Sequence, residues 1–186
     1  YLGFDLNSEP NKVNETIEKF GIGFMFAQKF HPAMKNVAKA RKIVGGRTAF
    51  NLLGPLTNPA IVKNQLIGVF SEKYQEKIVK ILQRKNAETI MAVRSADGMD
   101  ELSTTCKNQI CMLKNGTITK MTLDPQKVGL QKGNISDIQI RSKEDAIKSF
   151  ITVLNNTANK TKIEITALNA AGGLVISDIA DNFTDA

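Results

Sequence analysis

The stretch that decides the fold begins with Leu66-Ile67-Gly68-Val69-Phe70-Ser71. Its first five residues form an unbroken apolar run, which is typical of a strand buried on both faces of a sheet. Ser71 is a favourable N-cap for a following helix. One face of that helix is predicted to carry Tyr74, Ile78, Ile81 and Leu82. Because Thr89 to Val93 forms a second apolar run, the sequence predicts a β-α-β unit with two parallel strands.

A hairpin is predicted directly after this unit. The turn signal Lys114-Asn115-Gly116 separates Gln109–Leu113 from Thr117–Thr122, and Asn-Gly favours a tight turn between antiparallel strands. A further strand is predicted near Ile138–Ile140. Parallel and antiparallel pairs together indicate a mixed sheet in an α/β fold.

Two helices are predicted to follow this region. Ser142 and Asp145 form a capping box for the first of them. The second is predicted to start near Lys162, and its end is left open because the chain meets Gly172-Gly173.

In the N-terminal part of the chain, apolar residues recur instead with the spacing of a helix. A helix is predicted from Pro10 to Phe20, capped by Ser8 and ended by Gly21, and another from Pro32 to Val44. The period changes between Gly45 and Pro59, where Gly54–Pro59 is rich in helix breakers and predicts a rigid loop. We therefore expect residues 1–46 to be a helical segment that borders a small helical domain. Residues 47–186 are expected to be an incomplete α/β portion of a larger domain.

The composition of the 186 residues is that of a soluble globular protein, with 42% hydrophobic and 23% charged residues. The sequence has no apolar run long enough for a membrane span and no signal-peptide pattern. Cys106 and Cys111 have no metal-like partners nearby, which favours reduced thiols in a cytoplasmic protein. The net charge of +7 favours anionic partners such as nucleic acid, a membrane surface or phosphorylated metabolites. Because the lysines are scattered along the sequence, the net charge alone does not distinguish between these classes of partner.

Arg41 is the first candidate binding residue. On a helical wheel it falls inside the apolar arc, between Met34 and Val37, whereas Lys42 lies on a solvent-facing side. A guanidinium in that position needs an anion, so Arg41 is either an internal salt-bridge partner or a receptor for a substrate carboxylate or phosphate. The single histidine, His31, precedes the same helix and is either a loop residue or a substrate contact at the site entrance.

Asp97-Gly98-Met99-Asp100-Glu101 is the second candidate site. It follows the predicted strand Thr89–Val93, at the edge where open α/β sheets bind ligands. Adjacent carboxylates there suit Mg²⁺, which often links one or two carboxylates to substrate phosphates. The alternative is a solvated acidic turn. Gly54 and Pro55 form a third candidate, because they combine close backbone approach with rigidity, although an interdomain linker would need the same residues.

Two long motifs resemble the anthranilate phosphoribosyltransferase family. The first runs from His31-Pro32-Ala33-Met34-Lys35 through Arg41 to Gly54-Pro55-Leu56-Thr57-Asn58-Pro59, and the second is Asp97-Gly98-Met99-Asp100-Glu101-Leu102-Ser103. The resemblance implies the large α/β domain of a phosphoribosyltransferase of the nucleoside-phosphorylase type. It also implies transfer of a phosphoribosyl group from phosphoribosyl pyrophosphate to anthranilate in tryptophan biosynthesis, with Mg²⁺ and in a homodimer.

The same resemblance assigns roles to the candidates. Arg41 is similar to the arginine that binds the anthranilate carboxylate, and His31 to a histidine of the anthranilate pocket. Gly54 and Pro55 are similar to residues of the pocket wall. Asp100 and Glu101 are similar to the acidic pair that binds Mg²⁺.

The chain also departs from the family pattern. The sequence contains neither the family's Gly-Thr-Gly-Gly-Asp loop nor its Lys-His-Gly-Asn segment, so we expect this chain alone to be inactive. A pyrimidine-nucleoside phosphorylase of the same fold is the nearest alternative, and Arg41 argues against it. A non-catalytic relative that binds nucleic acid is another, although no basic stripe with interleaved aromatic residues supports it.

Overall fold

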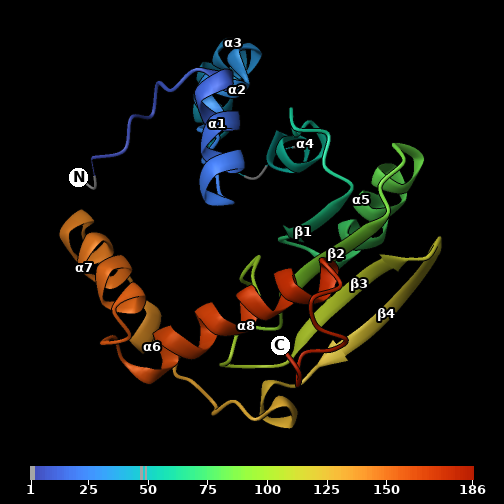
Figure 1. Cartoon of the computed structure of the whole chain (residues 1–186), viewed down its shortest axis with the longest axis vertical. Coiled ribbons are helices and arrows are strands. Elements are labelled where there is room, and N and C mark those ends of the chain that lie inside the picture. Colours follow the sequence, from blue (N-terminus) through green and yellow to red (C-terminus); the bar gives the residue numbers. More distant parts are fainter. Residues whose placement is uncertain (1–2, 47, 49) are drawn as a thin grey trace. The chain divides into compact units, whose positions relative to one another are not determined.

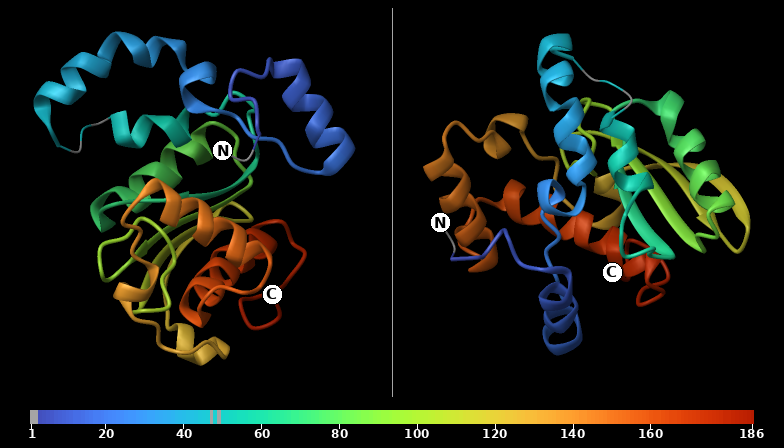
Figure 2. Two further views of the ribbon diagram at one scale, coloured as in Figure 1. Left: turned by 90° about the vertical axis from the view of Figure 1, so that its left-hand side faces the viewer. Right: turned by 90° about the horizontal axis from the view of Figure 1, so that it is seen from above.

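The computed structural model describes residues 3–46, 48 and 50–186, and of Lys35, Ala38, Lys39 and Arg41 it describes the backbone alone. The chain divides into two compact units, Tyr1–Pro59 and Ala60–Ala186. Figures 1 and 2 show helices throughout the first unit and a sheet with flanking helices in the second.

The first unit consists of short helices. They are α1 (Pro10–Phe20), α2 (Ala27–Phe30), a 3-10 turn (Pro32–Met34), α3 (Lys35–Val44) and α4 (Phe50–Leu56). The predicted helix Pro10–Phe20 is confirmed, and Gly21 ends it with a left-handed φ of 74°. The predicted helix Pro32–Val44 is confirmed too, although its first turn is a 3-10 turn.

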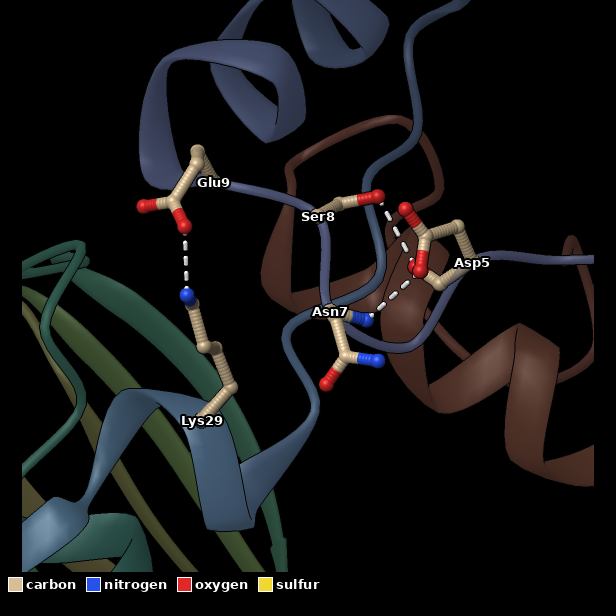
Figure 3. Close-up of polar contacts among 5 residues, drawn as sticks. All are labelled: Asp5, Asn7, Ser8, Glu9 and Lys29. Atoms are coloured by element: carbon tan, nitrogen blue, oxygen red, sulfur yellow. Dashed lines mark hydrogen bonds and ion pairs between the residues drawn. The ribbon is translucent and has the colours of Figure 1, made fainter.

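The start of α1 differs from the prediction (Figure 3). Ser8 does not cap the helix, because Glu9 is the N-cap residue and makes no side-chain cap hydrogen bond. The Ser8 hydroxyl instead donates to the Asp5 carbonyl oxygen over 2.8 Å, and Asn7 N–H donates to the Asp5 carboxylate over 2.9 Å. Lys29 Nζ pairs with Glu9 Oε1 at 2.5 Å, which ties α2 to the beginning of α1.

The second unit opens with the predicted β-α-β unit. Strand β1 (Asn64–Gly68) is followed by α5 (Glu72–Arg84) and β2 (Thr89–Ser95). The two strands are parallel, and their register runs from Asn64 opposite Thr89 to Gly68 opposite Val93. The predicted apolar face of α5 is partly wrong, since Ile81 is 41% exposed whereas Val79 is fully buried.

Strands β3 (Asn108–Lys114) and β4 (Thr117–Leu123) complete the sheet in the order β1-β2-β3-β4. Both pairs, β2 with β3 and β3 with β4, are antiparallel, so the predicted mixed sheet and the hairpin are confirmed. The turn residues Asn115 and Gly116 have φ values of 51° and 75°, as a tight hairpin turn requires.

Past the hairpin, the chain is helical. It forms a 3-10 turn (Pro125–Val128), α6 (Ile135–Ile138), α7 (Lys143–Leu154) and α8 (Lys160–Ile176). The strand predicted near Ile138–Ile140 is wrong. Asp137 of α6 is instead held by α8, because Asn159 Nδ2 donates to its carbonyl over 3.0 Å and Thr161 Oγ1 to its carboxylate over 3.1 Å.

The capping predictions for the last two helices have mixed outcomes. The capping box before α7 is confirmed in part: Ser142 Oγ accepts from Asp145 N–H, whereas the Asp145 carboxylate accepts from Arg141 N–H. Helix α8 starts earlier than predicted and runs straight through Gly172-Gly173.

Helices α5 and α8 cover opposite faces of the sheet (Figures 1 and 2). A buried hydrophobic cluster lies on the α8 side, where Leu168, Val175 and Ile176 pack with Met91 and Val93 of β2. Across the described ranges, no helix combines the length and the apolar character that a membrane crossing requires. The sheet and its two helices therefore form a scaffold on which the loop after β2 is mounted.

Candidate functional site

The acidic motif forms the loop between β2 and β3, as predicted. Asp100 and Glu101 are both exposed, and both line a cleft of about 520 Å³. The cleft also includes Gly68 at the end of β1, Val93 near the end of β2 and three residues of α8, namely Ile165, Thr166 and Asn169. The acidic pair therefore lies at the carboxyl ends of the two parallel strands, where α/β folds bind ligands.

Asp97 has a structural role in this loop. Its carboxylate accepts hydrogen bonds from the hydroxyls of Ser95, Ser103 (3.0 Å) and Thr105, and from Met99 N–H (3.3 Å). Burial raises the pKa of Asp97, but the hydrogen bonds from Ser95 and Thr105 outweigh burial and bring the pKa down from 3.8 to about 2. An ionised Asp97 thus organises the loop through its hydrogen bonds, while Asp100 and Glu101 line the cleft.

Two asparagines hold the backbone just after the acidic pair. Asn169 Oδ1 accepts from Leu102 N–H over 3.0 Å, and its Nδ2 donates to the Leu102 carbonyl over 2.7 Å. Asn108 repeats the pattern one residue later: its Oδ1 accepts from Ser103 N–H over 2.7 Å, and its Nδ2 donates to the Ser103 carbonyl over 2.9 Å.

Gly68 forms the floor under Asp100. A Cβ atom built on Gly68 would lie 1.7 Å from the Asp100 carbonyl oxygen and 2.8 Å from its carbonyl carbon. No side chain fits in that space, so the loop reaches its position only because residue 68 is glycine.

The acidic pair has the chemistry of a partial metal site. Among the described residues, no group of three or more His, Cys, Asp or Glu side chains could hold an ion. Two neighbouring carboxylates match Mg²⁺, which is usually held by one or two carboxylates together with substrate phosphates and water. The donor set therefore fits a Mg²⁺ ion that is shared with a phosphorylated ligand.

The remaining predicted site residues lie in the first unit. His31 is the C-cap residue of α2. Its backbone N–H donates to the Ala27 carbonyl over 2.9 Å, and the residue is half-buried. The prediction of a loop over Gly54–Pro59 is partly wrong, because Gly54 and Pro55 belong to α4. Thr57 Oγ1 donates to the Leu53 carbonyl over 2.9 Å, which satisfies a carbonyl at the end of that helix. Arg41 belongs to α3, and its side chain lies outside what the structure describes.

Sequence reasoning missed Gly68, Asn108 and Asn169. Asn169 had a signal, because it is a polar residue within the apolar segment Ala167-Leu168-Asn169-Ala170-Ala171. A polar side chain in such a segment must find a hydrogen-bonding partner when it packs inward. Gly68 interrupts an apolar strand, which is a recognised sign of close backbone approach.

The chain is similar over its whole length to proteins of one family. A sequence profile described as "Glycosyl transferase family, a/b domain" matches residues 1–186. The anthranilate phosphoribosyltransferase of Nitrosopumilus maritimus (strain SCM1) is 60% identical over 186 residues, which make up 100% of this chain and 53% of that protein. The chain thus spans about half the length of the curated relatives that it matches.

Solved structures give the same result. The anthranilate phosphoribosyltransferase of Thermus thermophilus superimposes with a TM-score of 0.87 at 33% identity, over 98% of this chain and 54% of that one. The Saccharomyces cerevisiae enzyme in complex with PRPP and Mg superimposes with a TM-score of 0.86 at 26% identity, over 98% and 53% of the two chains. Because the profile matches residues 1–186 and the fold is shared, the chain belongs to the glycosyl transferase family with the a/b domain.

Proposed function

We propose that this chain is part of an anthranilate phosphoribosyltransferase, which transfers a phosphoribosyl group from phosphoribosyl pyrophosphate to anthranilate and releases pyrophosphate. The observation that carries the proposal is the pair Asp100 and Glu101 at the cleft edge of β1 and β2. Relatives along the whole chain bear the name of that enzyme. One solved relative is described as a complex with PRPP and Mg.

In this proposal, Asp100 and Glu101 hold Mg²⁺, which when bound supplies positive charge against the departing pyrophosphate. Both residues line the cleft, whereas the neighbouring Asp97 carboxylate is occupied by the hydroxyls of Ser103 and Thr105. Arg41 is proposed to bind the anthranilate carboxylate, with His31, Gly54 and Pro55 lining the acceptor pocket. Since the amine of anthranilate is neutral near pH 7, orientation of the two substrates contributes more than a strong base would.

The finer attributes of the complete protein are also part of the proposal. We infer that the complete protein is a homodimer in the cytoplasm.

The metal role is tested in the full-length protein with the double variant Asp100→Asn plus Glu101→Gln. Loss of anthranilate fluorescence is followed at increasing Mg²⁺. The variant should need far more Mg²⁺ for half-maximal turnover, with little change in anthranilate binding. The matched control is Glu144→Gln plus Asp145→Asn, an adjacent acidic pair at the start of α7. Unchanged Mg²⁺ dependence in the first variant would mean that the motif is only an acidic turn.

The acceptor role is tested with Arg41→Ala in the same protein. The KM for anthranilate should rise by the equivalent of about 2–5 kcal/mol, the range for truncating one member of a buried charge pair, with a much smaller change in the KM for the donor. Arg41→Lys should restore function only in part, because lysine lacks the planar fork. Lys42→Ala, on the neighbouring exposed position, is the control. Equal losses for both substrates would favour a structural salt bridge.

A further inference from the structure

The backbone of two consecutive loop residues is held in the same way by two side-chain amides. A primary amide offers one acceptor and two donors, so it can satisfy both the N–H and the C=O of a single residue. Asn169 does this for Leu102, and Asn108 does it for Ser103. Each asparagine thus supplies the hydrogen-bond donor and acceptor that the backbone of a neighbouring strand would otherwise provide.

Burial makes these hydrogen bonds necessary. Leu102, Ser103 and Asn108 are all 0% exposed, so water does not reach the backbone groups that the amides satisfy. Leaving such groups without a partner costs free energy. The two amides are therefore part of what allows the loop to enter the core immediately after its two exposed carboxylates.

The two asparagines differ in what they connect. Asn108 is the first residue of β3 and lies five residues after Ser103. Asn169 lies on α8, 67 residues from Leu102, and its Nδ2 also donates to the Ile165 carbonyl of its own helix over 2.9 Å. Asn169 is thereby fixed to α8 and connects the backbone of the loop to that helix.

We propose that Asn169 is a positioning residue for the acidic pair: by clamping Leu102 it sets the direction in which Asp100 and Glu101 enter the cleft. This inference rests on the proposed Mg²⁺ role of that pair. The geometry supports it from two sides, since the Asp100 backbone rests on Gly68 and the Leu102 backbone is tied to α8. Glu101 lies between these two fixed points, and Asn169 lines the same cleft.

The test compares Asn169→Ala with Asn159→Ala in the full-length protein. Asn159 belongs to the same helix as its N-cap, accepts from Lys162 N–H over 2.9 Å and donates to the Asp137 carbonyl over 3.0 Å. It does not line the cleft. Both variants lose local hydrogen bonds of α8, but only Asn169→Ala releases the acidic loop.

Three measurements separate positioning from stability. The first is the melting temperature, which both variants should lower. The second is amide hydrogen exchange at Leu102 in metal-free protein, which should accelerate in Asn169→Ala alone. The third is the affinity for Mn²⁺, a spectroscopic probe for Mg²⁺, followed by electron paramagnetic resonance with phosphoribosyl pyrophosphate present. Asn169→Ala should weaken that affinity about tenfold or more, as loss of groups that orient metal ligands does.

The outcomes distinguish this inference from the function on which it rests. Equal Mn²⁺ affinities in the two alanine variants would overturn the positioning role while leaving the metal site intact. Unchanged Mn²⁺ affinity in Asp100→Asn plus Glu101→Gln would overturn both. If Asn169→Ala does not fold, Asn169→Gln keeps the amide on a longer side chain and should weaken Mn²⁺ binding in the same direction by a smaller factor. No weakening in that variant would count against the proposal.

Discussion

Gly68 and Gly173 offer a matched pair of glycine-to-alanine substitutions. At Gly68 an added Cβ meets the Asp100 carbonyl oxygen at 1.7 Å, whereas at Gly173 it meets no atom within 4 Å. Gly68→Ala should therefore lower the free energy of unfolding by about 1–3 kcal/mol, as overpacking does. Gly173→Ala should raise it by up to about 1 kcal/mol, because alanine favours a helix over glycine. Urea unfolding of both variants measures these changes. Similar free energies of unfolding for the two variants would show that the loop moves aside freely.

Asp97 predicts a specific dependence of stability on pH. Its pKa is lowered from 3.8 to about 2, because the hydrogen bonds from Ser95 and Thr105 outweigh burial. A carboxyl with a lowered pKa contributes stability that is fully present above its unfolded pKa and is lost as the pH falls through its folded pKa. Asp97→Asn should therefore be less stable than wild type at pH 7, and the difference should shrink between pH 4 and pH 2, around those two values. Denaturant unfolding across that range measures it. A pH-independent difference would mean that Asp97 is not the titrating group.

The hairpin of β3 and β4 depends on its turn. Gly116 has a φ of 75°, a value that costs other residues about 1–2 kcal/mol. Gly116→Ala should lower the free energy of unfolding by about that amount, whereas Asn115→Gly should have a much smaller effect, because glycine also adopts positive φ. Thermal unfolding compares the two variants. Equal destabilisation would indicate that the Asn115 side chain, rather than the turn geometry, holds the hairpin.

Local patterns in the sequence were enough to predict most strands and helices. Apolar runs predicted β1 and β2, the Asn-Gly turn predicted the hairpin, and the position after β2 predicted the acidic loop. The strand near Ile138–Ile140 failed because its apolar pattern gave no sign that α8 would hold Asp137. Asn169 was missed for the same physical reason. Its partner lies 67 residues away, and no local period encodes such a contact.

The two units of the chain differ in their capacity to fold alone. In Ala60–Ala186, the buried cluster around Met91, Leu102 and Leu168 joins the sheet to α8. Among the described residues of Tyr1–Pro59, the buried hydrophobic side chains are Val13 and Leu56. Because burial of apolar surface is the main driving force, residues 60–186 should unfold cooperatively when expressed alone, and residues 1–59 should not. Circular dichroism during heating distinguishes them. A cooperative transition in the shorter piece would contradict this view.

Helix α8 contains two adjacent glycines and yet closes one side of the core. Glycine lowers the intrinsic tendency to form a helix, so this segment should be poorly ordered as an isolated peptide. In the native chain, Leu66 and Leu102 pack against Gly172. A methyl group of each leucine lies 3.4 Å from a Cβ atom built on that glycine. We therefore expect the C-terminal half of α8 to form only after β1 and the acidic loop have assembled. The helix that fixes the carboxylates would then be among the last parts of the unit to order, and its mutations should change the unfolding rate more than the folding rate.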